Sequence, residues 1–327
     1  MKAKPDNYVI GVDGGGTKTV AALADLAGRI LKIGRAGSSS PRNVGIKRAA
    51  QNIAQAIKKA FKKGKNGRIL STFVGLPAVE EEYRSKKEEI KKEILKQKGI
   101  SPILKGTLII GSDQITAFRA GTKEKEGIML IAGTGCAAHG WKGNRETKCT
   151  GWGWLADEGA AFWVGQKVFQ AIFKELDGRG PKTLLTKMVF QKLKTKIKEN
   201  LSSKIYSKNP TETIPLFSVF CDSVARKGDR VAKAILLEAA RELALSLKTV
   251  IKKLDFKKQK FPVVLVGGMF KSKIVLDTVQ KEVKKIAPGA QFIQPKKAPA
   301  IGAVRLAIEQ LNGRDSKNKS KKPKENN

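Results

Sequence analysis

The chain has 327 residues, and its 65 lysines and arginines outnumber its 29 acidic residues, which gives a formal net charge of +36. This length fits one large or two medium domains. No apolar run reaches the roughly 18 residues of a membrane span, and the N-terminus lacks the apolar core of a signal peptide. The cysteines Cys136, Cys149 and Cys221 lack CxxC spacing, which argues against a disulfide framework or a zinc site. We therefore expect a cytoplasmic protein that makes no membrane contact.

The excess of positive charge would attract nucleic acid or another polyanion. The lysines, however, fall mainly on predicted exposed helix faces, as at Lys58, Lys59, Lys284 and Lys285. A base-stacking surface requires arginines and aromatic residues among its basic residues, and these lysines are not interleaved with them. We interpret them as a solvated surface and expect no specific nucleic-acid partner, although a nucleic-acid-binding regulator stays open as an alternative.

The first predicted element is an apolar strand, residues 8–12, that ends at Asp13 and is followed by a second apolar run at 20–23. The connection consists of Gly14, Gly15, Gly16, Thr17, Lys18 and Thr19. Because no helix opens after the glycines, this is neither a Walker A loop nor a dinucleotide fingerprint. The pattern predicts two strands joined by a turn whose amides, with the Thr17 hydroxyl, bind phosphate. Asp13 is a candidate Mg²⁺ ligand. An ordinary hairpin is the alternative.

A polar loop at 37–43 precedes a predicted helix at 44–62. Asn43 either faces a polar ligand or caps that helix. A strand at 70–76 and a charged helix at 84–98 follow, and the alternation of strands and helices predicts an α/β domain.

The strand predicted at 107–113 ends at a second carboxylate, Asp113. Ligands of open α/β sheets bind beyond the carboxyl ends of the strands, so Asp13 and Asp113 could converge on one cleft. A carboxylate there could accept a proton from an attacking hydroxyl. The alternative is that Asp113 only caps a helix at 115–120.

A second unit of the same design follows, with a strand at 128–131, then Ala132, Gly133, Thr134 and Gly135, and strand-like sequence at 138–142. Two such turns indicate a duplicated architecture with a nucleotide between the halves. Further on, Asp157 lies near Gly151, Trp152 and Gly153, and these small neighbours would let a sugar-sized ligand approach.

The remainder, from residue 181, is predicted mostly helical, with helices at 218–227 and 230–254. A strand at 261–266 runs into Gly267 and Gly268, where an adenine and ribose could lie on bare backbone; a tight strand-to-helix turn is the alternative. After a short strand at 290–293 and a helix at 299–311, we expect residues 312–327 to form a disordered basic tail.

This ordered set of motifs resembles the N-acetylglucosamine kinase family and the related BadF/BadG/BcrA/BcrD ATPase family, within the sugar kinase, Hsp70 and actin superfamily. The set comprises Asp13 to Thr17, Asp113, Ala132 to Gly135, Gly151 to Gly153, Asp157 to Gly159, Val266 to Gly268, and the closing Ala-Ile-Gly-Ala helix. The resemblance covers about residues 8 to 311. It implies two ribonuclease-H-like α/β domains with an interdomain cleft for ATP and Mg²⁺. The domains would span 1–118, with helix 299–311 as a candidate addition, and 119–298, with a helical insertion.

The resemblance also implies residue roles. Thr17 and Thr134, with their neighbouring glycines and Lys18, would hold the ATP phosphates, Asp13 would position Mg²⁺, and Ala225, Gly267 and Gly268 would border the adenosine. Asp113 would be the base toward the sugar hydroxyl, and the remaining sugar contacts would come from Asn43, Cys136, Ala137, Gly151, Trp152, Gly153 and Asp157. Cys136 and Ala137 stand where the kinases place polar groups beside the sugar, and Ala156, Ala160 and Gln114 are further departures from the family pattern.

The sequence thus predicts an ATP-dependent kinase that phosphorylates a hydroxyl of an amino sugar of the N-acetylglucosamine or glucosamine type, with homodimer formation left open. The alternative is an ATPase that couples hydrolysis to a partner protein. Three isolated cysteines fit poorly with the iron–sulfur cluster expected of such activators.

Overall fold

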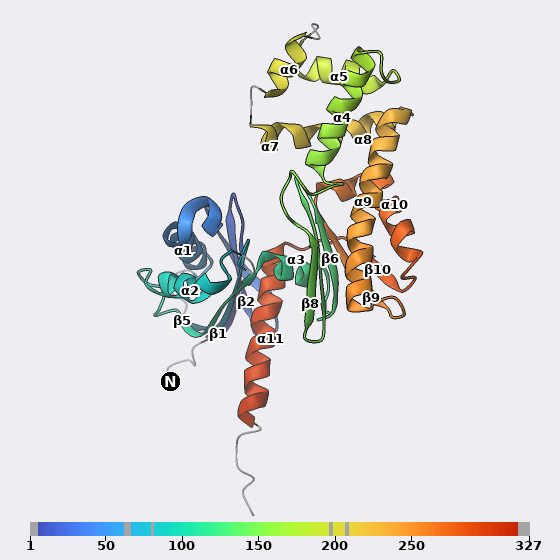
Figure 1. Ribbon diagram of the computed structural model, residues 1–327. Helices are drawn as coiled ribbons and strands as arrows, with labels where there is room; N and C mark the ends of the chain where they lie inside the picture. The colour runs from blue at the N-terminus through green and yellow to red at the C-terminus, as the bar shows by residue number, and fades with distance from the viewer. Residues whose placement is uncertain (1–5, 62–66, 80–81, 196–198, 207–208, 320–327) are drawn as a thin grey trace, which may run out of the picture. The chain divides into compact units, whose positions relative to one another are not determined.

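The computed structural model describes residues 6–61, 67–79, 82–195, 199–206 and 209–319. Contacts group the chain into two compact units, an N-terminal unit of residues 1–123 with 295–327 and a C-terminal unit of residues 124–294. Each unit is built on one five-stranded sheet with helices (Figure 1). Over the described ranges, no helix is both long and apolar enough to cross a membrane.

The sheet of the N-terminal unit has the strand order β3-β2-β1-β4-β5. Its strands are β1 (Asp6–Gly14), β2 (Thr19–Asp25), β3 (Ile30–Ala36), β4 (Gly67–Leu76) and β5 (Leu104–Ser112). The first three form an antiparallel meander, and β4 and β5 add in parallel to β1. The parallel strands β1, β4 and β5 therefore bring their carboxyl ends to one edge of the sheet.

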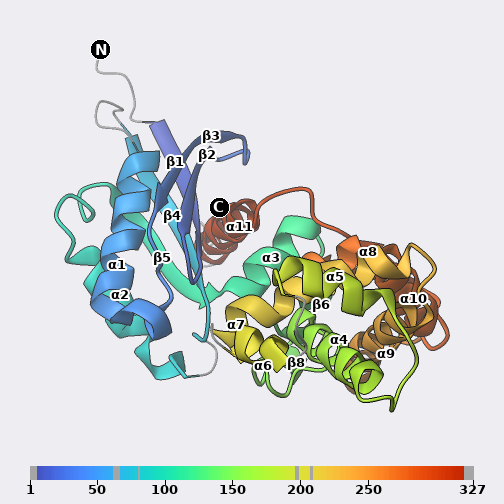
Figure 2. The same ribbon diagram turned by 90° about the horizontal axis from the view of Figure 1, so that it is seen from above.

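Helices cover both faces of this sheet. Helix α1 (Pro41–Ala60) and helix α2 (Lys87–Leu95), which follows the short η1 (Arg84–Lys86), lie on one side, and α11 (Pro299–Lys319) lies on the other (Figure 2). A small hydrophobic core lies between the sheet and α11. In it, Val9, Ala22 and Phe73 of the sheet pack against Ala303 and Val304 of α11. Helix α3 (Asp113–Gly121) leaves the end of β5 and packs against α11.

The C-terminal unit repeats this topology with the order β10-β9-β6-β7-β8. The strands are β6 (Gly127–Ala132), β7 (Cys136–Lys142), β8 (Arg145–Thr150), β9 (Phe261–Val266) and β10 (Ala290–Ile293). The first three form the meander, and β9 and β10 add in parallel to β6. The predicted duplication is therefore confirmed, strand for strand.

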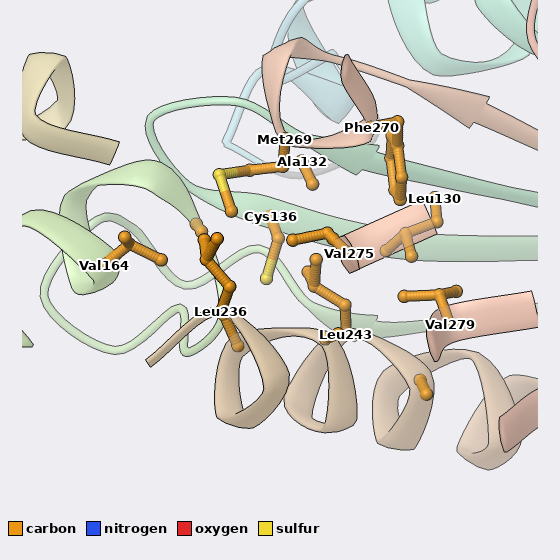
Figure 3. Packing of buried hydrophobic residues seen from close by; sticks show 14 of the residues in the cluster. Leu130, Ala132, Cys136, Val164, Leu236, Leu243, Met269, Phe270, Val275 and Val279 are labelled. Atoms are coloured by element: carbon orange, nitrogen blue, oxygen red, sulfur yellow. The ribbon is translucent and has the colours of Figure 1, made fainter. Parts of the chain in front are cut away.

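The helices of the C-terminal unit include those inserted between β8 and β9. They are α4 (Ala161–Leu176), α5 (Leu184–Lys192), α6 (Glu199–Tyr206), α7 (Pro210–Thr213), η2 (Ile214–Leu216), α8 (Phe217–Ala225) and α9 (Arg230–Leu254), and η3 (Gly268–Lys271) and α10 (Lys273–Lys284) follow β9. Leu130 of β6 packs with Leu243 of α9 and with Val275 and Val279 of α10 (Figure 3). The long α9 has the bounds that its apolar stripe predicts.

Two predictions about the chain's course need correction. Strand β8 was not expected, because the sequence from Arg145 to Thr150 is polar and its residues are only partly buried or exposed. The final helix does not stop at Leu311 but continues to Lys319, so the prediction of a disordered tail is wrong for residues 312–319. Residues 320–327 lie outside the described part of the chain.

Glycines allow α11 to touch the elements that carry the two predicted acidic site residues. A Cβ at Gly11 of β1 would lie 2.2 Å from the Val304 nitrogen, and one at Gly302 would lie 1.9 Å from the Thr116 oxygen of α3. Real Cβ atoms do not approach backbone this closely, so both contacts require glycine. The backbone of α11 thereby rests on β1, which carries Asp13, and on α3, which begins at Asp113.

This close packing predicts the effect of adding one methyl group to α11. Gly302→Ala should destabilise the protein by about 1–3 kcal/mol, because the helix must shift away from Thr116. Gly313→Ala is the matched control, since space around Gly313 is open and alanine there should stabilise the helix by up to about 1 kcal/mol. Urea unfolding of both variants measures the difference. Equal stability of the two variants would contradict the proposed contact.

Candidate functional site

The turn between β1 and β2 presents backbone N–H groups on one side. The carbonyl oxygen of Gly15 accepts hydrogen bonds from the Ser39 amide (3.1 Å) and the Ser38 hydroxyl (3.2 Å), and the carbonyl of Gly16 accepts from Nδ2 of Asn43 (3.4 Å). A trans peptide points its N–H opposite to its C=O. The amides of Gly16 and Thr17 therefore point away from the loop that holds the turn, which is the orientation that anion binding requires.

The glycines of this turn serve packing rather than an unusual backbone conformation. None of Gly14, Gly15 and Gly16 has a positive φ. A Cβ at Gly14 would instead lie 2.4 Å from both the Leu76 side chain and the Ser39 hydroxyl. Thr17 and Lys18 are exposed at the tip.

A polar network behind the turn was missed by the sequence reasoning. The buried hydroxyl of Thr19 donates to the Gly37 carbonyl (2.6 Å) and bonds to the Ser39 hydroxyl (2.8 Å), and Nδ2 of Asn52 donates to the Ser38 carbonyl (2.5 Å). The serine run at 38–40 was the available signal, but we had interpreted it only as a polar loop. These bonds fix the loop that in turn fixes Gly15.

The alternative that Asn43 caps α1 is wrong. The helix begins at Pro41, and Ser40 is its N-cap residue. Asn43 lies in the first turn, which a non-helical Gly45 (φ of 74°) separates from the rest of the helix. The Asn43 side chain reaches the glycine turn through its bond to Gly16. The structure thus brings Asn43 together with the predicted phosphate-binding residues.

Asp13 and Asp113 lie at the same edge of the N-terminal sheet and interact electrostatically. Asp13 pairs in register with Gly75 of β4, and Gly75 pairs with Gly111, two residues before Asp113. Burial, and after it the negative charge of Asp113, raise the pKa of Asp13 to about 6, although the Lys18 ammonium opposes both effects. The two carboxylates therefore interact within this unit, and that they line one ligand cleft stays a prediction.

The capping alternative for Asp113 is wrong. Ser112 is the N-cap of α3, and its hydroxyl accepts a hydrogen bond from the Gln114 amide at 3.0 Å. Asp113 is the first residue of the helix, where a negative charge is favoured by the helix dipole. The N-cap of α3 is therefore the Ser112 hydroxyl and not the Asp113 carboxylate.

The second glycine turn has the same design in the C-terminal unit. The carbonyls of Gly133 and Thr134 accept hydrogen bonds from the amides of Ala161 (2.9 Å) and Phe162 (3.1 Å) at the start of α4. By the same peptide geometry, the amides of Thr134 and Gly135 point away from α4. Thr134 is exposed, and both turns therefore offer two successive N–H groups and a threonine.

Asp157 organises the loop at 151–153 through its backbone amides. Its carboxylate is buried, and Oδ1 accepts hydrogen bonds from Gly151 and Trp152 (both 2.9 Å), while Oδ2 accepts from Gly153 (3.3 Å) and Cys136 (3.2 Å). Gly151 and Gly153 have φ values of 87° and 112°, which a residue with a side chain rarely adopts. Asp157 thus shapes the loop that leads from β8 to α4.

Cys136 is placed differently from the expectation that it lies beside a substrate. Its side chain is 3% exposed and points into the hydrophobic core with Leu236 and Leu243 (Figure 3). Burial raises the pKa of its thiol to about 12, and Sγ donates to the Glu158 carbonyl at 3.3 Å. A side-chain contact between Cys136 and a ligand is therefore excluded in this conformation.

Ala137 remains beside the loop. A Cβ at Gly151 would lie 3.2 Å from the Ala137 Cβ, so Ala137 borders the loop that Asp157 shapes.

The chain's one histidine, His139, is fully buried and stacks on Trp141 with the ring centroids 4.0 Å apart. Burial lowers its pKa to about 3.

The residues expected around an adenosine lie on two elements of the C-terminal unit. Gly267 directly follows β9 and has a φ of 118°, and a Cβ there would lie 2.2 Å from the Ala132 oxygen. This contact holds Gly267 against the strand that leads into the second glycine turn. Space around Gly268 is open, whereas Ala225 is buried at the end of α8.

The carboxylates fit a weakly held divalent cation. No group of three or more acidic, histidine or cysteine side chains in the described part of the chain could enclose a metal ion. Mg²⁺ is commonly bound by one or two carboxylates together with water and substrate phosphates. Asp13, which is partly buried and charge-coupled to Asp113, suits that pattern.

Comparison with known proteins gives the family. The model of the BadF/BadG/BcrA/BcrD ATPase family matches residues 10–307. The chain belongs to this family. It is 31% identical over 308 residues to the N-acetylmuramic acid/N-acetylglucosamine kinase of Clostridium acetobutylicum, an alignment that covers 92% of this chain and 98% of the relative. It is also 31% identical over 319 residues to the N-acetyl-D-glucosamine kinase of Dictyostelium discoideum, with 91% and 97% covered.

Solved structures agree on the fold. A candidate N-acetylglucosamine kinase from Chromobacterium violaceum aligns with a TM-score of 0.66 at 21% identity, covering 92% of this chain and 98% of that one. A ROK family glucokinase from Streptomyces griseus, solved with glucose and AMPPNP, aligns with a TM-score of 0.54 at 17% identity, with 92% and 99% covered. This BadF/BadG/BcrA/BcrD family member thus shares the two-sheet α/β fold of these solved structures.

Proposed function

We propose that the protein is an ATP-dependent kinase that phosphorylates a hydroxyl of an amino sugar of the N-acetylglucosamine type. Two observations together carry this proposal. In each glycine turn, two successive amides point away from the segment that holds the turn. In addition, the carboxylates of Asp13 and Asp113 interact electrostatically. The names of the two curated relatives support the choice of substrate.

In this proposal both turns bind phosphate oxygens of ATP. The amides of Gly16 and Thr17 serve in one unit and those of Thr134 and Gly135 in the other. Phosphoryl transfer depends mainly on positioning and on electrostatic stabilisation of the transferring group, and fixed N–H dipoles supply both. The Lys18 ammonium, at the exposed tip of the first turn, adds positive charge there.

Asp113 is the proposed general base. As the first residue of α3, it stands at a strand end, and its carboxylate would accept the proton of the attacking sugar hydroxyl. The loop at 151–153 and Asn43 would position the sugar. We assign Asp157 an indirect role, because its carboxylate already accepts four backbone hydrogen bonds and holds that loop.

Asp13 is the proposed Mg²⁺ ligand. When bound, Mg²⁺ would neutralise charge on the ATP phosphates. The raised pKa of Asp13 means that a proton competes with the cation near neutral pH. Cation binding by this carboxylate is therefore expected to weaken as the pH falls toward 6.

This competition predicts a pH dependence. The affinity for Mg²⁺-ATP should fall as the pH drops through about 6, because protonation of Asp13 removes the charge that attracts the cation. Asp113→Asn should shift this transition to lower pH, since the charge of Asp113 helps to raise the pKa of Asp13. Isothermal titration of Mg²⁺-ATP between pH 5 and 8 (about one pKa unit or more on either side) measures both effects. A transition that does not move in Asp113→Asn would contradict the coupling.

A coupled ADP-release assay tests the activity. The substrates are hexoses, amino sugars and N-acetylated amino sugars, each with a control that lacks sugar. We expect ADP release that depends on an amino sugar. Release at the same rate without any sugar would favour the alternative of an ATPase that acts with a partner protein.

A further inference from the structure

An arginine of α11 holds the C-terminal end of α3, the helix that begins at Asp113. Nη1 of Arg305 donates hydrogen bonds to the carbonyl of Arg119 at 2.6 Å and to the carbonyl of Thr122 at 3.0 Å. The carbonyls of a helix's last turn have no hydrogen-bond partner within the helix, and the helix dipole favours a cation beside them. Arg305 thus satisfies the end of α3 from a neighbouring helix.

An ion pair ties the same turn of α3 to α11 a second time. The side chain of Arg119 is only 3% exposed, and its guanidinium contacts the Glu309 carboxylate. A charge buried this deeply is costly unless it is paired. Glu309 lies four residues after Arg305, so the two side chains leave the same face of α11. We call Arg119, Arg305 and Glu309 the helix clasp.

The first turn of α3 lies directly against the sheet. Thr116 is fully buried, and its hydroxyl donates to the Asp113 carbonyl at 2.7 Å. A Cβ at Gly75 of β4 would lie 2.5 Å from the methyl carbon of Thr116, and Gly75 is the register partner of Asp13. The placement of α3 on β4 therefore sets the position of Asp113 relative to Asp13.

The clasp limits how α3 can move on β4. Helix α3 has nine residues, about two and a half turns, and Ser112 joins it to β5. If its far end were free, so short a helix could pivot about Ser112 and turn the Asp113 carboxylate. Catalytic groups must be held within about 0.5 Å and about 10–20° of the productive geometry. A small pivot of α3 would therefore be enough to misplace Asp113.

We propose that Arg305 and Glu309 are positioning residues for Asp113 and that they act on it through α3. The clasp keeps α3 seated on β4, so that the Asp113 carboxylate is aligned with the sugar hydroxyl. The proposal rests on the kinase function and on the role of Asp113 proposed above. It predicts an effect on kcat rather than on ATP binding, because the first glycine turn is held by hydrogen bonds from the loop at 37–43.

Steady-state kinetics of two Arg305 variants test the proposal. Arg305→Met removes both hydrogen bonds to α3 and should lower kcat about tenfold, while the KM for ATP stays within about twofold. Arg305→Lys should recover most of the lost kcat. One nitrogen of Arg305 makes both bonds, so a lysine ammonium can make them as well.

Glu309→Gln gives a second variant in case Arg305→Met does not fold. Glutamine keeps an acceptor oxygen for Arg119 and removes only the negative charge, and the Glu309 side chain is 35% exposed. This variant should lower kcat about threefold or more, again with little change in the KM for ATP.

Lys248→Met is the matched control. Lys248 of α9 pairs with Glu282 of α10 at 2.8 Å, and this partly buried ion pair joins two helices of the C-terminal unit. Its loss should lower the melting temperature, as the loss of the clasp does, and leave kcat unchanged. All variants are assayed well below their melting temperatures. A fall in kcat that Lys248→Met shows equally would mean that general destabilisation is the cause and would overturn the inference.

Hydrogen–deuterium exchange of the ligand-free protein separates this inference from the kinase proposal. Arg305→Met should speed exchange across α3, and Lys248→Met should not. If the wild-type protein phosphorylates no sugar, the kinase proposal fails, and the positioning role fails with it even where exchange shows that the clasp holds α3. If the wild-type protein is active, an unchanged kcat in Arg305→Met overturns the positioning role alone, whether or not α3 exchanges faster.

Discussion

Replacing Asp113 by asparagine is expected to lower kcat by about 10²- to 10⁴-fold, the usual contribution of a general base. Asparagine has nearly the same shape as aspartate but cannot accept the hydroxyl proton. The glycine turn and its serine supports do not involve the Asp113 carboxylate, so the KM for ATP should change little. Steady-state kinetics with N-acetylglucosamine, varied separately from ATP, gives both parameters.

Asp25→Asn is the control for this experiment. Asp25 is an acid of the same unit, at the end of β2, and it pairs with Arg29 on the surface. Its replacement should leave kcat unchanged. If Asp113→Asn keeps the wild-type kcat, another group removes the proton and the assignment of Asp113 fails.

Replacing Asp157 by alanine is expected to disrupt the sugar-binding loop. Four backbone N–H groups would lose their common acceptor, and each one that stays buried without a partner costs about 1–3 kcal/mol. Gly151 and Gly153 would be free to leave their left-handed conformations, so the loop should lose its shape. We expect at least a tenfold (roughly 1.4 kcal/mol) rise in the KM for the sugar and a lower melting temperature.

Glu158→Gln provides the comparison for Asp157→Ala. Glu158 is the adjacent acid, but it is exposed. Its backbone carbonyl accepts a bond from Cys136, and its carboxylate interacts with Glu242 and not with the loop at 151–153. Its variant should keep both the sugar KM and the melting temperature. A variant of Asp157 that is as stable and active as that of Glu158 would show that the loop does not depend on the carboxylate.

Much of the fold could be predicted because local patterns and tertiary structure agree. The apolar stripe of α9 gives its bounds, and the two strand–glycine–strand units predict the repeated meander. Strand β8 could not be predicted in this way, since its polar residues pair with β7 at the end of the sheet and bury little. The extension of α11 beyond Leu311 was missed for a similar reason, because its composition is that of a tail.

The candidate site was predictable in residue type but not in residue role. Strand ends and glycines identify Asp13, Asp113 and the two turns. The sequence does not say which carboxylates are already bonded, and so Asp157 was expected to face a ligand and Ser112 was not recognised as the cap of α3. The inward orientation of Cys136 likewise follows from β7 register and core packing. That both turns serve one bound nucleotide stays a prediction.

The most direct test is to incubate the purified protein with Mg²⁺-ATP and N-acetylglucosamine and to quantify ADP and sugar phosphate by ³¹P nuclear magnetic resonance and mass spectrometry. We expect one sugar phosphate for each ADP, and neither product in appreciable amount when the sugar is omitted. ADP that accumulates together with inorganic phosphate, without a phosphorylated sugar, would contradict the assignment as a sugar kinase.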